Sequence, residues 1–128
     1  MIIPQILSNA RTTMPSIYHA DTQLRIIKRL HVCKSWASRL KGLLGRTSLD
    51  PDEGVWISPC DSIHTFFMMM SIDVVFLDES LVIVKLIRNM TPFQICLPVK
   101  YAASVLEGPV GMIQRSGLEK GTKLEFRA

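Results

Sequence analysis

Two kinds of side chain in this sequence could carry chemistry: a cysteine near a histidine, and two isolated acids. Cys60, Asp61 and His64 lie within five residues of one another. A neighbouring base can convert a thiol into a thiolate nucleophile, and residues four apart can share one face of an extended loop. The cluster therefore fits a hydrolase or transferase, and it equally fits a buried inert thiol beside a hydrogen-bonded histidine.

The two isolated acids are Asp73, inside a strongly apolar run, and Glu107, at the end of another. A carboxyl group among apolar neighbours can have a raised pKa and act as a general acid or base. The alternative is structural, because buried acids are usually paired. In that case we expect each carboxylate to contact Arg39, Arg46 or backbone N–H donors.

Metal binding is not favoured by the remaining cysteine and histidine spacing. His31 and Cys33 could form a second pair beside Cys60 and His64, but the sequence lacks a C-x-x-C motif. Three widely spaced cysteines do not indicate a disulfide framework and fit a reducing compartment. We therefore predict no metal, no cofactor and a cytoplasmic location.

The apolar run at residues 66–70, Phe-Phe-Met-Met-Met, is the most direct indication of a binding surface. In a strand, alternate side chains face opposite sides, so Phe67, Met69 and the flanking Thr65 would line a second apolar surface or groove. Methionine suits adaptable binding surfaces, and a core covering both faces is the alternative. The predicted ligand-binding residues are Trp36, Arg39, Arg46, His64, Phe66, Phe67 and Met68.

A basic segment precedes this run. Residues 25–46 contain seven Lys or Arg residues and no acid, in a chain whose formal net charge is +4. Such a segment can associate with an anionic membrane surface or nucleic acid, or it can be a solvated basic face. No run approaches the about 18 apolar residues of a transmembrane helix.

The elements that must position these residues follow from hydrophobic period and turn signals. Strands are expected near residues 24–33, 55–57, 72–77, 81–88, 101–107 and 122–127, the third and fourth being apolar on both faces and hence central. Helical turns are expected at 110–116. Strands that follow strands directly favour a largely antiparallel sheet. The predicted fold class is α+β, mainly β: a compact, antiparallel, barrel-like or sandwich-like sheet of about six strands with one or two short helices.

One helix is predicted after Ser35, a suitable N-cap, with Gly45 ending it. Trp36, Leu40, Leu43 and Leu44 recur on its apolar side, and Arg39 and Lys41 are placed on the opposite side. Gly42 inside the helix predicts close approach of another backbone. Residues 1–21 are expected to form a loosely ordered leader before a single domain at 22–128.

Several separated motifs resemble the DUF192 (UPF0127) family. They are RLKGLLGR at 39–46, SIHTFFM at 62–68, IDVVFLD at 72–78, SVLEG at 104–108 and GLEKG at 117–121, in the family's order. The resemblance implies a compact, mostly β domain and assigns no activity. The chain departs from the family pattern at Met69, where a cation is frequent, at Ser71, where proline is common, and at Thr122, where aspartate is usual.

The sequence as a whole favours a small soluble binding or interaction module over an enzyme. Its partner would be a small molecule or a protein, bound in an apolar groove beside the basic helix. The alternatives are a hydrolase or transferase using Cys60 and His64 or an acid (Asp73, Glu107), and association of residues 25–46 with an anionic surface or nucleic acid.

Overall fold

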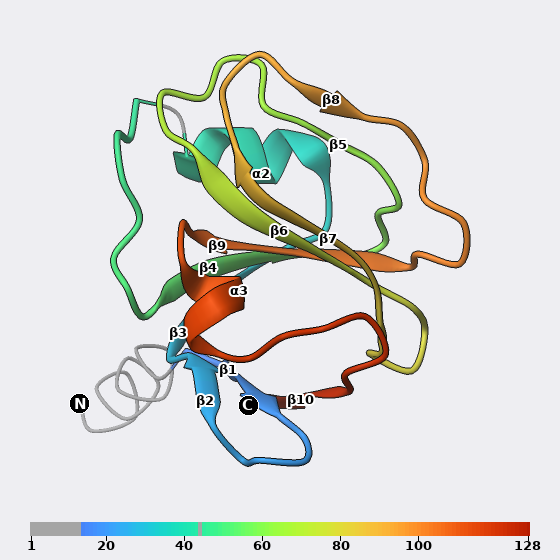
Figure 1. Cartoon of the computed structure of the whole chain (residues 1–128). Helices are drawn as coiled ribbons and strands as arrows, with labels where there is room; N and C mark the ends of the chain where they lie inside the picture. Colours follow the sequence, from blue (N-terminus) through green and yellow to red (C-terminus); the bar gives the residue numbers. More distant parts are fainter. Residues whose placement is uncertain (1–13, 44) are drawn as a thin grey trace, which may run out of the picture.

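The computed structural model describes residues 14–43 and 45–128 and is mainly β (Figure 1). Its elements are β1 Ser16–His19, β2 Arg25–Ile27, β3 Arg29–Cys33, α2 Trp36–Leu43, β4 Glu53–Ile57, β5 Ile63–His64, β6 Ile72–Leu77, β7 Ile83–Met90, β8 Ile95–Cys96, β9 Ser104–Pro109, α3 Met112–Arg115 and β10 Leu124–Arg127. The predicted α+β, mainly β class is confirmed.

A five-stranded sheet forms the middle of the molecule, in the order β3-β4-β9-β6-β7. Its pairs are antiparallel except β3 with β4, which run parallel. Parallel neighbours need a crossover, and the β3–β4 connection supplies one through α2. All six residues of β6 are buried between β9 and β7, as the apolar run at 72–77 predicts.

Layers on both faces of the sheet explain why β6 is apolar on both sides. Val74 and Phe76 pack with Leu43 of α2 and Ile63 of β5. The alternate residues of β6, such as Leu77, point to the other face and pack against α3 and the second sheet, whose order is β10-β1-β2. Figure 1 shows α2 with the β5–β8 pair on one side of the five-stranded sheet and β1, β2, β10 and α3 on the other.

Helix α2 begins and ends where the sequence predicts, but its orientation differs. The Ser35 hydroxyl accepts the Ser38 N–H at 3.1 Å, and Gly45 has a φ of +78°, which favours glycine. The prediction that Arg39 faces outward is wrong, because Arg39 is 1% exposed. Among residues 14–43 and 45–128 no backbone from outside the helix approaches Gly42, so that prediction is wrong as well. The helical role predicted for Leu44 lies outside the described residues.

Other differences arise where chain direction changes. The predicted strand 24–33 is divided at Lys28, since the N–H groups of Lys28 and Arg29 both donate to the Asp52 carbonyl and direct β2 and β3 into different sheets. The strand predicted at 81–88 was expected to be central because it is apolar on both faces. It is β7, which lies at the edge of the five-stranded sheet. Strand β1 lies inside the predicted leader and pairs with β10, so the folded part begins upstream of residue 22.

Glycine at 108 is required by packing across the sheet. A Cβ there would overlap the Met112 sulfur of α3, which lies over β9. Gly108 pairs with Asp73 of β6, whose carboxylate faces the same side. Glu107 therefore presents its carboxylate to the α2 side of the sheet, and Gly108 leaves room for the Met112 side chain on the α3 side.

Candidate functional site

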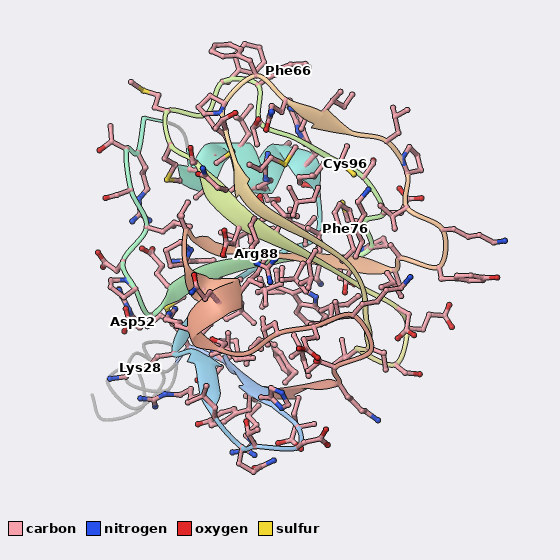
Figure 2. All side chains as sticks on the ribbon, viewed as in Figure 1. Lys28, Asp52, Phe66, Phe76, Arg88 and Cys96 are labelled. Atoms are coloured by element: carbon pink, nitrogen blue, oxygen red, sulfur yellow. The ribbon has the colours of Figure 1, made fainter. Side chains whose placement is uncertain are left out.

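Two of the seven predicted binding residues, Trp36 and His64, line a cavity of about 540 Å³ between α2 and the β5–β8 pair, which we call the His64 cavity. It is lined by Trp36, Ile57, residues 59–64 and residues 95–98. The β5–β8 register sets His64 opposite Ile95 and thereby makes two walls from distant segments. In Figure 2, Phe66 and Cys96 mark this side of the molecule.

Aromatic rings cluster around His64. The Trp36 ring centroid lies 4.9 Å from that of His64, and the Phe66 ring is stacked at 5.1 Å. The Phe66 N–H donates to His64 Nδ1 at 3.3 Å, which assigns the proton of the neutral ring to Nε2. Burial, followed by the charge of Arg39, lowers the pKa of His64, so the imidazole is neutral near pH 7.

Cys60 also lines the His64 cavity, but its environment does not activate the thiol. Its sulfur donates to the Ser62 carbonyl at 2.9 Å. Burial raises the pKa of Cys60, and the carboxylates of Glu107 and Asp61 act in the same direction. A nucleophilic cysteine needs the opposite shift, so this geometry does not support the form of the hydrolase or transferase alternative that uses Cys60 as nucleophile.

The apolar run at 66–70 is a turn, not a strand. Phe67 has a φ of +69°, and the alternation that the sequence predicts holds from Phe67 to Met70 but not at Thr65 and Phe66. Phe67 and Met69 are each 62% exposed, whereas Met68 is buried in the core. Thr65 is buried too, and its hydroxyl donates to the Thr91 carbonyl at 2.6 Å, so its predicted place on the surface is wrong.

The two acids lie on opposite faces of the sheet and both have structural partners. Asp73 accepts N–H groups from Asn89 at 2.9 Å, Gly111 at 3.1 Å and Ile113 at 3.0 Å. Glu107 accepts both of its bonds from Arg39 Nε, at 2.5 and 2.8 Å, with both side chains fully buried. These are the structural partners expected for the two carboxylates.

Arg46 lies apart from the His64 cavity, in an ion-pair network that the sequence did not reveal. Its guanidinium donates to both oxygens of Glu53, at 2.6 and 2.7 Å, and His31 Nε2 lies 2.9 Å from the same carboxylate. The only signal for Glu53 in the sequence is its place in an acidic turn. Together with Arg29, which pairs with Asp50 at 2.7 Å, these contacts neutralise much of the basic segment.

The Glu53 network predicts a specific acid sensitivity. Arg46, with smaller help from His31, lowers the pKa of Glu53 to about 2 from 4.5. A lowered folded-state pKa stabilises the protein above about pH 4.5, and this stability is lost as pH falls towards 2. We expect Glu53→Gln to remove on the order of 2 kcal/mol at pH 7 and much less at pH 3. Urea unfolding of both proteins from pH 7 to 3 measures this, and parallel pH profiles would contradict it.

A second cavity, of about 530 Å³, lies on the other side of α2 and is called the Arg39 cavity. It is lined by residues 14–15, 30–33, 38–39 and 42–43, by Arg46 and by Val55. Burial raises the pKa of Cys33 in its wall, as does the nearby Glu107 carboxylate. The sequence placed Arg39 in a ligand site but did not indicate that α2 separates two cavities.

Two further features concern metals and membranes. In the parts of the chain at 14–43 and 45–128, no group of three or more His, Cys, Asp or Glu side chains is arranged to hold a metal ion. Within the same residues, neither helix has the length and apolar composition that crossing a bilayer requires.

Comparison with known proteins gives consistent matches. The family model DUF192, described as an uncharacterized ACR, matches residues 17–126. A UPF0127 protein of Pyrococcus abyssi is 43% identical over 65 residues, covering 51% of this chain and 55% of that protein. A UPF0127 protein of Thermococcus sibiricus is 34% identical over 106 residues, covering 77% of this chain and 66% of that protein. The chain thus matches about half to two thirds of the length of these relatives.

Among solved structures, a protein of unknown function from Novosphingobium aromaticivorans superposes with a TM-score of 0.71 at 24% identity. That alignment covers 87% of this chain and 82% of the other. At this identity the likeness establishes the fold alone.

Proposed function

The chain belongs to the DUF192 family, and we propose that it is a binding module whose ligand is a small, largely apolar molecule held in the His64 cavity. The observation that carries this proposal is the cavity itself, about 540 Å³ in volume and walled by α2 and the β5–β8 pair. Small-molecule sites are typically concave, mainly apolar and supplied with a few polar groups.

The composition of the cavity wall supports an apolar ligand with one or two polar atoms. Trp36, Ile95 and Leu97 supply apolar area, and Asp61 is the one ionised side chain among the lining residues. The neutral His64 ring and the Cys60 thiol add weaker polar groups that can orient a ligand without the cost of burying a charge.

The two segments that form the cavity and its surroundings are apolar although much of their surface is exposed. Residues 62–72 and 89–99 contain no charged side chain. Within them Phe66 is 38% exposed, Phe67 62%, Phe93 74% and Leu97 70%. Exposed aromatic and aliphatic groups gathered around a cavity are characteristic of a binding surface. Phe66 stacks on His64, and Ile95 and Leu97 line the cavity, so we define these three residues as the apolar rim of the site.

A neutral fluorescent probe tests the proposal. N-phenyl-1-naphthylamine should bind saturably and change the emission of Trp36, which is 44% exposed in the cavity wall. Trp56→Phe removes the other tryptophan and leaves Trp36 as sole reporter. Ile95→Asp should lower the affinity for the probe by at least about tenfold, because it replaces an apolar side chain in the cavity wall by a carboxylate that must stay hydrated.

The matched control is Val110→Asp, which places the same charge on an exposed valine outside the cavity lining. It should leave the affinity for the probe within about twofold. Probe binding that is equally sensitive to both substitutions, or that leaves Trp36 emission unchanged, would contradict the proposal. Binding of the probe by neither the parent protein nor the control would do the same.

A further inference from the structure

The Arg39 guanidinium has more N–H donors than acceptors in a fully buried position. Nε donates to Glu107, and Nη2 donates to the Met68 sulfur at 3.1 Å. A thioether is a weak acceptor. Nη1 has no hydrogen-bond partner among the described residues. Because buried N–H groups are nearly always paired in native proteins, this atom marks a place where an acceptor is needed.

The lining of the Arg39 cavity suits such an acceptor. Among the described lining residues, the charged and titratable side chains are His31, Arg39, Arg46 and Cys33, and none is a carboxylate. Arg46 and His31 are already bound to Glu53, so the donor that lacks a partner belongs to Arg39. Most of the remaining wall is apolar. A cavity of this kind fits a molecule with an anionic end and an apolar body.

We propose that the Arg39 cavity binds a small apolar carboxylic acid, whose carboxylate pairs with Nη1 and Nη2 of Arg39. Glu107 holds the Nε edge of the guanidinium and fixes its orientation. The ligand carboxylate replaces the Met68 thioether at Nη2 and gains Nη1, which makes a bidentate pair. Nη1 is fully buried, and Met68 lies behind the residues that line the cavity. The carboxylate therefore reaches the guanidinium only when the unbranched, flexible Met68 side chain moves aside, so binding and Met68 displacement occur together.

This second site is independent of the His64 cavity, since the two cavities share no lining residue. It also gives a reason for burying Arg39 and Glu107, because an isolated buried ion pair is seldom favoured for stability alone. The pair holds a planar donor group in place for a planar acceptor.

Octanoate and 1-octanol are the probes, added to the full chain labelled with ¹³C at the methionine methyl groups. Octanoate should bind saturably and shift the Met68 methyl resonance, while the exposed Met69 methyl serves as an internal control. Octanol lacks the carboxylate and should bind at least tenfold more weakly. Arg39→Lys keeps a cation for Glu107 but loses the planar pair of N–H donors that binds a carboxylate, and should lower the affinity for octanoate by at least tenfold. Met68→Leu assigns the resonance and should bind octanoate as well as the parent or better.

Two results would overturn the proposal. Equal affinity for octanol and octanoate in the parent protein would mean apolar adsorption only, and this comparison needs no folded variant. Loss of octanoate binding in Ile95→Asp, with no Met68 shift in the parent, would place the acid in the His64 cavity. The latter result would remove the second site and leave the function proposed for the first intact.

Discussion

Replacing Arg39 by methionine is expected to lower the free energy of unfolding by about 3–5 kcal/mol, because Glu107 is then left buried without a counter-charge. Both side chains are fully buried, and Arg39 supplies the two hydrogen bonds of the carboxylate. Arg39 and Leu43 are also the two buried residues of α2, so loss of the pair loosens the helix that separates the two cavities.

A double-mutant cycle isolates the pair. Glu107→Leu alone should also be destabilising, since it leaves a buried guanidinium with fewer acceptors. The double variant with methionine and leucine should recover most of the loss, because neither residue requires hydration. Urea unfolding at pH 7 gives the four free energies. Additive effects of the two substitutions would contradict the assignment.

Arg29→Met provides the matched control on the surface. Arg29 pairs with Asp50 at 2.7 Å, but both side chains are largely exposed. Removing the Arg29 side chain should lower the free energy of unfolding by less than about 1 kcal/mol. Similar losses for the two arginines would mean that burial does not set the strength of the Arg39 contact.

The pH dependence of the Arg39→Met deficit has a definite sign. Burial raises the pKa of Glu107, and Arg39 opposes that shift. Without Arg39 the pKa must rise further, so the folded variant takes up a proton more readily than its unfolded state. Its stability relative to the parent should therefore improve as pH falls and worsen as pH rises. A deficit that does not change between pH 7 and 5 would argue against an ionised Glu107.

Features fixed by neighbouring residues were predictable from the sequence. The cap at Ser35 and the left-handed glycine at 45 set the ends of α2 through local hydrogen bonding and backbone freedom. The apolar run at 72–77 likewise identified the fully buried strand β6, and the strand expected after it pairs with it as β7. In each case the information lies within a few residues, where propensity and period operate.

Features fixed by distant contacts were predictable only in part. Arg39 is one of the partners that the sequence predicts for a buried acid, but the helical pattern placed it on the polar side of α2, and its partner Glu107 is 68 residues away. The strands predicted from the sequence do not include β8, because it is two residues long and gains its place only by pairing with β5. A prediction from the helical period places every arginine on the solvent-facing side, because the period carries no information about a buried acidic partner elsewhere in the chain.

The candidate site was recovered only in part for the same reason. Trp36, His64 and Phe66 do meet, but Met68 packs beneath α2 and Arg46 binds Glu53. The predicted alternation fails at Thr65, which is buried where the pattern places it on the surface with Phe67, and the positive φ of Phe67 turns the chain between Thr65 and Met68. The wall at 95–98 was missed because nothing local to that segment indicates that it faces His64.

Replacing Asp73 by alanine should lower the free energy of unfolding by at least about 3 kcal/mol, because three backbone N–H donors lose a charged acceptor. Asp73 joins β6 to the end of β7 and to the segment that enters α3, so all three elements depend on one carboxylate. Asp73→Asn keeps one acceptor oxygen but turns an amide towards a donor, and should show an intermediate loss. Urea unfolding of the three proteins measures the order.

Asp78→Ala is the matched control, since Asp78 also accepts two backbone N–H groups, from Ser80 at 2.8 Å and Val82 at 3.0 Å. That turn is open to water, which can replace the lost acceptor, so about 1 kcal/mol is expected. The two variants also separate structure from function. Asp73 lies on the sheet face away from the His64 cavity, so whatever fraction of Asp73→Ala stays folded should bind N-phenyl-1-naphthylamine normally. A variant that keeps parental stability and loses the probe would reverse this conclusion and make Asp73 a ligand-binding residue.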